Sequence, residues 1–329
     1  MTVDVHSHFL PVELAEYLAA CKDEQTGVNA VLQDGVWQIK TNSGFAFPLV
    51  PEYYDYEKRV VDMDKARIDK SVLSISPLFF FYDTDPKIAL EICQLCNDWA
   101  FRFALEHSER FDSMAMVPMQ DIDLAIQEMD RAHRELGMQA VEIAPVINGE
   151  MLDDPKFFPF YQYCEEHGIL LYLHPALVDR RPPYDKYHAM NLMGYVQETN
   201  WALVRMLFGG VFEQFPGLKV LTSHAGGQFP YQFGRLMHGH EVRQEAKIHV
   251  TKPLTNYLKN IYFDTITHWT PALQFLVDNF GADHVLMGTD YPYDMADSRP
   301  VDSVEALKLT SSERSMILAG NTCGLLSKK

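Results

Sequence analysis

The feature that most limits how this chain can fold is a repeated alternation of short β-type segments with amphipathic helical segments. Eight such β-type segments occur along the 329 residues. Alternating strands and helices are typical of parallel sheets in which a helix forms each crossover, and eight units can close a barrel. We therefore expect an α/β fold of the (β/α)8 TIM-barrel class. The expected strands span residues 2–5, 71–74, 112–116, 140–143, 170–173, 220–222, 261–264 and 285–288.

Two connections between these segments are unusually long, and long connections in compact domains often carry function or structure of their own. The first covers residues 10–58, and within it residues 30–39 predict a hairpin around an Asp-Gly turn. The second runs from His174 to about residue 198. We expect a single domain over residues 1–329, with a small β insertion at about residues 10–58 after the first strand.

Composition limits the partners and the compartment. The formal net charge of −17 repels phosphate backbones and anionic lipids, so we expect neither nucleic acid nor membrane as a partner. The first residues show no basic, apolar leader pattern, so we expect no signal peptide, and we expect no membrane span because no apolar run is long enough. The five cysteines are odd in number and irregularly spaced, which favours a reducing cytoplasm. Cys93 and Cys96 form a CxxC, but they lie in a helical pattern and are expected to pack within a helix.

Four residues predict a metal centre. His6 and His8 lie two positions apart at the end of the first expected strand, so both side chains point to one face. His174 ends the fifth strand and Asp290 ends the eighth, and these strand ends meet at one mouth of a barrel. Three imidazoles and a carboxylate suit one Zn²⁺ ion, with Mn²⁺ as the alternative, and no organic cofactor is expected. Four unrelated polar residues are the competing interpretation.

Three more strand ends carry groups that could take part in chemistry. His224 follows the sixth strand and precedes two glycines, and we interpret it as a general acid or base, with a metal ligand and a structural residue as alternatives. Asp264 ends the seventh strand, where it could hydrogen-bond a ligating histidine or only cap the strand. Glu142, at the end of the fourth strand, could face the pocket or pair with a nearby base.

The motifs around these residues resemble the amidohydrolase superfamily, in the branch of aminocarboxymuconate semialdehyde decarboxylase and related aromatic acid decarboxylases. The resemblance covers nearly the whole chain. It implies one zinc or manganese ion bound by His6, His8, His174 and Asp290, with His224 and Asp290 taking part in catalysis. It rests on the segments Asp4–Phe9, His174-Pro175, Ser223–Gly227, Phe229–Arg235 and Gly288–Tyr293.

The resemblance also implies a reaction: metal-dependent, non-oxidative loss of CO2 from a substituted aromatic or muconate-like carboxylic acid. Protonation of the carbon that bears the carboxylate creates the electron sink for C–C cleavage, and the metal stabilises the developing charge. The alternative is a hydrolase, acting on a C–C bond or a lactone, or a hydratase of the same superfamily. A binding protein that bears a metal but has no activity is a third, weaker interpretation.

Substrate contacts follow from the same resemblance. Arg235 matches an arginine that reaches the neighbouring subunit's site, which implies a homodimer, although a surface ion pair is the alternative. The family's other carboxylate-binding arginine falls near Phe47, which is apolar here. Together with Phe80, in an aromatic run, and Tyr293, Phe47 favours a flat aromatic body over a dicarboxylate. A place in the core is the alternative for the aromatic run. Arg180 and Arg181 could replace the missing cation, but a solvated position is the more common one for such a pair.

Overall fold

Short parallel strands form the centre of the molecule, and the computed structural model describes residues 1–21, 26–41, 46–176 and 183–327. Each of the eight expected strands is present, with the third divided into two short pieces. The strands form one sheet in the order β1-β5-β6 and another in the order β14-β13-β12-β11-β8-β7. Their bounds are β1 (Val3–Phe9), β5 (Lys70–Ile75), β6 (Phe111–Ser113), β7 (Ala115–Met116), β8 (Ala140–Ile143), β11 (Leu170–Leu173), β12 (Lys219–Thr222), β13 (Ile261–Asp264) and β14 (Val285–Leu286).

Hydrogen bonds at two seams join these sheets into a closed barrel. At the first seam, Met114 lies between β6 and β7 and donates its N–H to the carbonyl of Leu73, 2.8 Å away. At the second, the N–H of Val5 donates to the carbonyl of Met287 at 2.9 Å, and a parallel bridge pairs Ser7 with Tyr291. The predicted (β/α)8 barrel is therefore confirmed, and its first and last strands are neighbours.

The barrel interior is filled in layers, as its alternating strands require. The layers at the amino ends of the strands are mainly hydrophobic, and two residues of the C-terminal segment, Ala319 and Leu325, close that end of the barrel. The strand residues of this cluster are Val3, Val5, Val72, Met114, Ala140, Leu170, Tyr172, Leu221 and Leu286. The next inward positions toward the carboxyl ends of the strands are polar or aromatic. This change in side-chain type places the chemistry of the molecule at one end of a dry, packed barrel.

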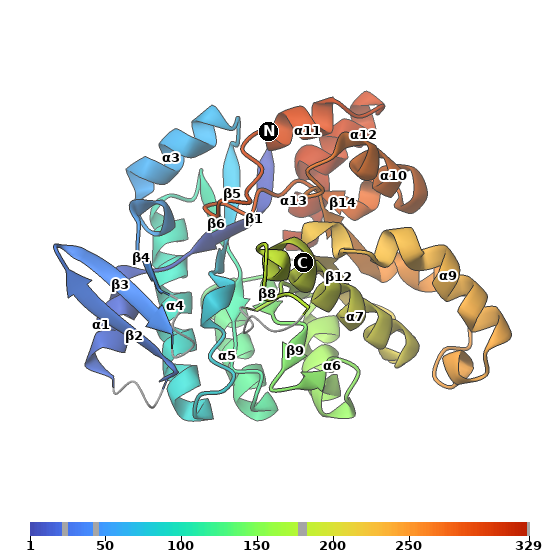
Figure 1. The fold of residues 1–329 in the computed structure, drawn as a ribbon, viewed down its shortest axis with the longest axis horizontal. Helices are drawn as coiled ribbons and strands as arrows, with labels where there is room; N and C mark the ends of the chain where they lie inside the picture. Colours follow the sequence, from blue (N-terminus) through green and yellow to red (C-terminus); the bar gives the residue numbers. More distant parts are fainter. Residues whose placement is uncertain (22–25, 42–45, 177–182, 328–329) are drawn as a thin grey trace.

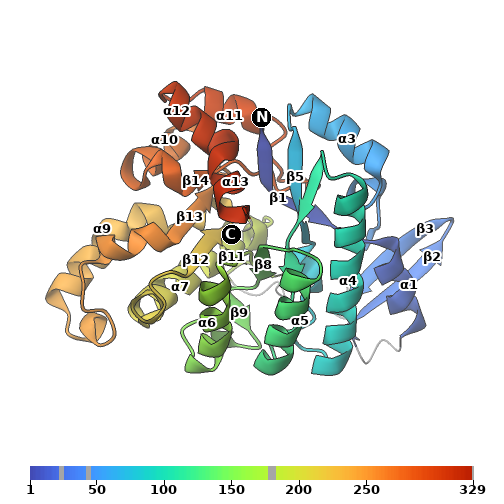
Figure 2. The ribbon, with the colours of Figure 1, turned by 180° about the vertical axis from the view of Figure 1, so that it is seen from behind.

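Helices surround the strands on the outside (Figures 1 and 2). The predicted helices are present, and Asp or Pro stands at several of their starts, as expected for helix N-termini. Cys93 and Cys96 are buried within α4, in agreement with packing. The larger helices are α3 (Tyr56–Lys65), α4 (Pro86–Glu106), α5 (Ile122–Arg134), α6 (Phe158–His167), α7 (Tyr195–Phe208), α9 (Phe229–Val242) and α10 (Thr270–Phe280). None of the helices in the described ranges is long and apolar enough to cross a membrane.

The predicted β insertion follows the first strand and lies at one side of the barrel in Figure 1. Strands β2 (Val28–Gln33) and β3 (Val36–Thr41) form the expected antiparallel hairpin, and β4 (Ala46–Pro48) adds a third strand. The turn residues Asp34 and Gly35 have φ values of 51° and 81°, which Asp-Gly turns accommodate. Helix α1 (Val12–Ala20) connects β1 to this small sheet.

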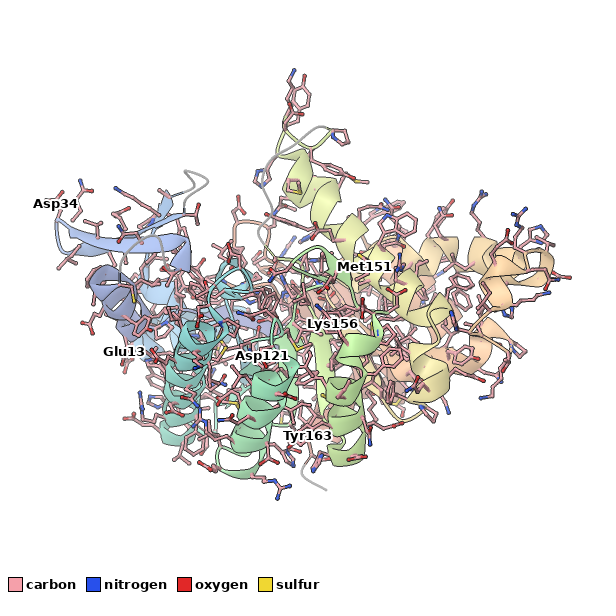
Figure 3. All side chains as sticks on the ribbon, turned by 90° about the horizontal axis from the view of Figure 1, so that it is seen from below. Glu13, Asp34, Asp121, Met151, Lys156 and Tyr163 are labelled. Carbon is pink, nitrogen blue, oxygen red and sulfur yellow. The ribbon has the colours of Figure 1, made fainter. Side chains whose placement is uncertain are left out.

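The cap of α5 gives a test of how the outer helices are held. The Asp121 carboxylate accepts a hydrogen bond from the N–H of Leu124 at 3.1 Å and stands at the start of the helix (Figure 3). Asp121→Ala should lower the free energy of unfolding by about 1 kcal/mol, because the first turn loses this acceptor. Urea unfolding followed by circular dichroism measures it. The control is Asp123→Ala, which lies in the same turn but is exposed and should lower the free energy of unfolding clearly less. Equal losses in the two variants would contradict a capping role for Asp121.

Candidate metal centre

The four predicted ligands meet at the carboxyl end of the barrel, around one carboxylate oxygen. Asp290 Oδ1 lies 3.1 Å from His6 Nε2, 3.2 Å from His8 Nε2 and 3.9 Å from His174 Nε2. The two Nε2 atoms of His6 and His8 are 3.0 Å apart. All four side chains are buried, with at most 6% of any residue exposed. The structure thus brings together residues from β1, from the end of β11 and from the segment after β14.

The opposite edge of each imidazole is fixed, so that its Nε2 turns toward this point. His6 Nδ1 lies 2.8 Å from Asp264 Oδ2, and His8 Nδ1 lies 3.0 Å from the carbonyl oxygen of Ile75. His174 Nδ1 lies 3.0 Å from the carbonyl oxygen of Pro175. Partners of this kind set the ring orientation and the tautomer of a ligating histidine, leaving Nε2 as an electron-pair donor.

The electrostatics of the cluster favour neutral imidazoles at His8 and His174 beside an ionised Asp290, whereas they favour the protonated form of His6. Burial lowers the pKa of His8 to about 4, and burial with the neighbouring imidazoles lowers the pKa of His174 well below its usual range. Burial also disfavours a charged His6, but the carboxylates of Asp290 and Asp264 outweigh it and raise the pKa of His6 to about 10. Burial of Asp290 disfavours its charged form. The charge of His6 and the surrounding hydrogen bonds outweigh this effect and hold the pKa of Asp290 well below its usual value. A cation at the centre would replace the proton on His6.

The spacing of these donor atoms fits a divalent metal ion. A tetrahedral ion with bonds of about 2.0–2.1 Å has donor atoms about 3.3 Å from one another, close to most of the separations found. Two of the donors, His174 Nε2 and Asp290 Oδ1, are buried and have no hydrogen-bond partner in the described structure. Buried polar atoms without partners are costly, and coordination of an ion would satisfy both.

His224 stands on a strained loop beside the predicted ligands. Its Nε2 is 3.4 Å from Asp290 Oδ2, and its φ of 52° is in the left-handed region, as is that of Ala225. Gly227 is required here, because a Cβ at this position would lie 2.1 Å from the carbonyl oxygen of Val196. His6, His174, His224 and Asp290 all offer atoms within 4.8 Å of one another. The position of His224 therefore suits either a proton carrier or a further ligand.

Asp264 connects the ligands to this loop. Its Oδ2 faces His6 Nδ1 and also accepts from the N–H of His224, both at 2.8 Å. Its Oδ1 accepts from the N–H groups of Ala225 and Ile266, at 2.8 and 3.0 Å. Although Asp264 is buried, His6 and these hydrogen bonds lower its pKa. One carboxylate therefore positions both a predicted ligand and the predicted acid or base, which exceeds the role of a strand cap.

The residues predicted for substrate contact are divided between the site and its surroundings. Tyr293 lies at the site, with its ring centre 5.2 Å from that of His8 and its hydroxyl 2.6 Å from Ser76 Oγ. Phe47 is partly buried on β4, and its ring is 6.1 Å from that of Phe79. Phe80 is buried, and its ring stacks on that of Tyr82. Arg235 is exposed on α9. Arg180 and Arg181 lie outside the described residues.

Sequence reasoning missed two buried groups beside the ligands and left a third open. Arg59 of α3 donates to the carbonyl of His8, and Asp4 accepts from the N–H of His6. Neither residue carried a distinguishing motif, although Asp4 lies two positions before His6. Glu142 does face the interior, with Oε1 3.9 Å from His8 Nδ1 and neither oxygen hydrogen-bonded in the described structure. Burial raises the pKa of this carboxyl well above its usual value.

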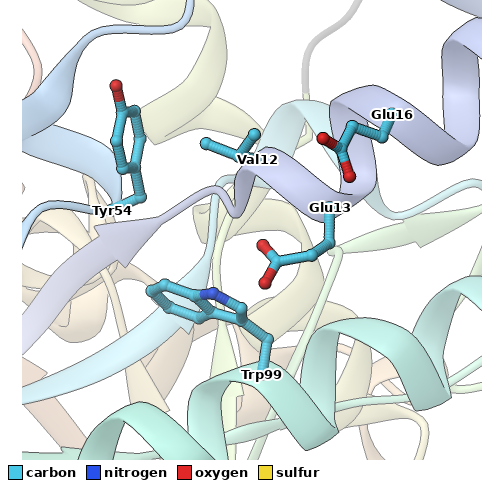
Figure 4. Close-up of a pocket in the computed structure, with 5 residues that line it drawn as sticks. All are labelled: Val12, Glu13, Glu16, Tyr54 and Trp99. Atoms are coloured by element: carbon cyan, nitrogen blue, oxygen red, sulfur yellow. The ribbon is translucent and has the colours of Figure 1, made fainter.

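A pocket of about 360 Å³ lies away from these residues, between α1 and α4 (Figure 4). It is lined by Val12, Glu13, Glu16, Tyr54 and Trp99. Both of its carboxylates are exposed, and the lining contains none of the predicted ligands. The candidate site is therefore the buried histidine cluster, where the donor atoms converge.

A closed (β/α)8 barrel with three imidazoles and a carboxylate converging at its mouth defines the class of metal-dependent barrel enzymes. The amidohydrolase family model matches residues 3–326, and the chain belongs to that family. A 2-amino-3-carboxymuconate-6-semialdehyde decarboxylase from Dictyostelium discoideum is 33% identical over 276 residues, which cover 83% of this chain and 77% of the relative. The predicted family, including its aromatic acid decarboxylase branch, is thus confirmed, and the chain is an enzyme of that carboxy-lyase group.

Two further matches extend the likeness. A gamma-resorcylate decarboxylase from Polaromonas sp. is 27% identical over 287 residues, covering 82% of this chain and 86% of the relative. A solved structure of a dihydroxybenzoic acid decarboxylase from Polaromonas sp. JS666, with bound manganese and the inhibitor 2-nitroresorcinol, superposes with a TM-score of 0.81. That structure is 24% identical and covers 99% of this chain and 96% of its own, so it supports the fold.

Asp264→Asn tests whether this carboxylate positions the ligands. The amide group provides one oxygen where the carboxylate provided two, so at least one N–H donor loses its acceptor. We expect metal affinity to fall about 10- to 100-fold, as measured by competition with a chromogenic chelator. Asp278→Asn, on the exposed side of α10, is the matched control and should leave affinity unchanged. Unchanged affinity in the Asp264 variant would show that the hydrogen bonds to His6 and His224 do not hold the site.

Proposed function

We propose that this enzyme removes CO2, without oxidation, from a substituted aromatic or muconate-like carboxylic acid, with His6, His8, His174 and Asp290 holding one divalent ion. The observation that carries the proposal is the convergence of three Nε2 atoms on Asp290 Oδ1, with a further imidazole, that of His224, 3.4 Å from the other carboxylate oxygen. Family membership supplies the reaction class, and the geometry supports the roles proposed for these residues.

The bound ion would supply charge stabilisation for the anionic substrate. His224 is placed to deliver a proton to the ring or diene carbon that bears the carboxylate, which breaks the conjugation at that carbon. The C–C bond to the carboxylate then cleaves, its electron pair restores the conjugated system, and CO2 leaves. In the net reaction one proton takes the place of the carboxyl group. Asp264 would keep His224 in position through its backbone N–H during this transfer.

The walls near the ligands favour a flat substrate body. Tyr293 lies against His8, and the Tyr53 ring is 6.2 Å from that of Tyr293. Phe47 is 6.4 Å from Tyr53 and takes the place expected for a family arginine. Aromatic walls bind planar apolar surfaces well, whereas a second carboxylate would need a cation. We therefore propose a substrate with an aromatic or conjugated body and a single carboxylate near the metal.

For the metal itself we propose Zn²⁺, because three imidazoles and one carboxylate suit it, and Mn²⁺ is the alternative. The manganese in the Polaromonas structure supports that alternative. We also propose that the chain forms one domain and works as a homodimer in the cytoplasm, where free cysteines such as Cys93 and Cys96 stay reduced. In such a dimer Arg235, exposed on α9, would reach the partner's substrate.

Product analysis tests the reaction directly. The metal-loaded protein is incubated in ²H2¹⁸O with a panel of hydroxylated and amino-substituted aromatic acids, muconate-like acids and lactones, and products are identified by mass spectrometry. We expect loss of CO2 with solvent hydrogen at the vacated carbon. His224→Gln should keep its metal and lose about 10²- to 10⁴-fold in kcat, because the proton carrier is removed. Incorporation of ¹⁸O with the carboxylate retained would establish a hydrolase or hydratase instead.

Mixing two inactive variants tests the role of Arg235. Arg235→Ala and His224→Gln should each be weakly active alone, the first through a raised KM. If Arg235 serves the neighbouring site, a mixed dimer contains one site with an intact His224 and an intact Arg235, so activity should recover after mixing and exchange of subunits. Sedimentation measures the assembly. No recovery in a confirmed mixed dimer would contradict the shared site.

A further inference from the structure

Arg59 is a fully buried arginine. The proposed catalytic scheme gives no reason for burying this charged side chain. It lies on α3, at the end of the insertion, with 1% of its surface exposed, and it is among the largest fully buried side chains. Its hydrogen-bond partners are three carbonyl oxygens and a hydroxyl rather than a carboxylate. Among the described residues Asp4 and Asp62 attract this charge, but neither forms an ion pair with it. Burying a charge without a close ion pair costs free energy, so the hydrogen bonds of Arg59 are expected to provide a function that an apolar side chain would not.

The guanidinium group joins two segments and packs against a third. Nη1 donates to the carbonyl oxygens of His8 and Glu52, both at 2.8 Å, and Nη2 donates to Ser7 Oγ at 2.6 Å. Its central carbon lies 5.1 Å from the centre of the Tyr291 ring, within the range of a cation–π contact. The group therefore connects the strand that carries two predicted ligands, the insertion, and the residue that follows Asp290.

Strand β1 needs such a support because its pairing is irregular where the ligands lie. The register with β5 passes from Asp4 opposite Ser71 to Ser7 opposite Leu73, so one extra residue is inserted in β1. A bulge of this kind disrupts the ladder hydrogen bonds and redirects side chains. Other groups take over: Asp4 Oδ1 accepts from the N–H of His6 at 3.0 Å, and the carbonyl of Tyr291 accepts from the N–H of His8 at 2.7 Å.

With Arg59 included, every polar group of His8 except Nε2 has a fixed partner. The N–H of His8 is held by Tyr291, the carbonyl by Arg59 and Nδ1 by the carbonyl of Ile75. Metal sites need their donor atoms held within about 0.5 Å of the binding geometry, so the backbone of an irregular strand has to be fixed from outside. Hydrophobic packing alone does not fix a carbonyl direction, whereas a planar donor group does.

We infer that Arg59 is a positioning residue of the metal centre: it holds the backbone of Ser7 and His8 across the β1 bulge and ties that strand to the insertion. The inference rests on the proposed metal site. Because the insertion also carries Phe47 and Tyr53, Arg59 connects the aromatic wall of the pocket to the strand of the His-x-His pair. It touches neither the ion nor the substrate and acts through the position of His8.

The experiment compares Arg59→Met and Arg59→Lys with Arg131→Met. Arg131, on the outer helix α5, forms ion pairs with Glu128 and Asp98. Zn²⁺ affinity is measured by chelator competition, site geometry by the visible absorption of the Co²⁺-substituted protein, and stability by unfolding of the metal-free protein. We expect Arg59→Met to bind Zn²⁺ at least tenfold more weakly with an altered Co²⁺ spectrum, and Arg59→Lys to be intermediate. Arg131→Met should lose stability but keep wild-type affinity and spectrum.

Wild-type affinity and spectrum in a folded Arg59→Met protein would overturn the inference, as would a loss of affinity equal to that of Arg131→Met. If the methionine variant does not fold, Arg59→Lys decides in the same way, since a lysine cannot reach Ser7 and both carbonyls with one planar group. None of these measurements uses turnover. A wild-type protein that binds no divalent metal would instead refute the proposed metal site, so the two failures are distinguishable.

Discussion

The hydrogen bonds that close the barrel between its first and last strands are the constraint on which the site depends. The N–H of Asp290 donates to the carbonyl of His6 at 2.8 Å, and Thr289 donates through its hydroxyl to Asp4 Oδ2 at 2.7 Å. These contacts place the carboxylate of Asp290 against the imidazoles of β1. They also hold Asp290 at a φ of 65°, a conformation that costs free energy for a residue with a Cβ and persists only where its surroundings enforce it.

The protein as a whole is negatively charged, whereas ionisable groups of both signs are buried together at the mouth of the barrel. The protein carries a net charge of −17, yet the buried layer at the mouth contains three imidazoles, a guanidinium group and several carboxylates. Burial alone would discharge each of these groups, and their mutual contacts decide which remain ionised. Against their burial, His6 and the surrounding hydrogen bonds lower the pKa values of Asp264 and Asp290. Burial raises the pKa of Glu142, whose two carboxyl oxygens have no hydrogen-bond partner in the described structure.

Much of the fold could be predicted because short β-type runs recur along the chain and most are followed by a helical pattern. The same logic brought His6, His8, His174 and Asp290 to one mouth, where the structure places them. The third strand was expected to be continuous but is interrupted at Met114, and the first continues to Phe9, beyond the expected end at Val5. Periodicity does not reveal a bulge, so the extra residue in β1 and its partner Arg59 had no signal. The role of Phe80 stays a prediction, because an aromatic run looks alike in a core and in a pocket wall.

The distance along the chain between the first and last predicted ligands has a consequence for biosynthesis. His6 is made 284 residues before Asp290, and Ala319 and Leu325, which close the bottom of the barrel, are made later still. At about 5–20 residues per second, the ribosome needs roughly 15–60 seconds to pass from one to the other. During that interval the paired histidines lack their carboxylate, so the nascent chain cannot assemble the site. A chain released early would lack the metal centre, and the capacity to retain metal therefore distinguishes finished molecules from incomplete ones.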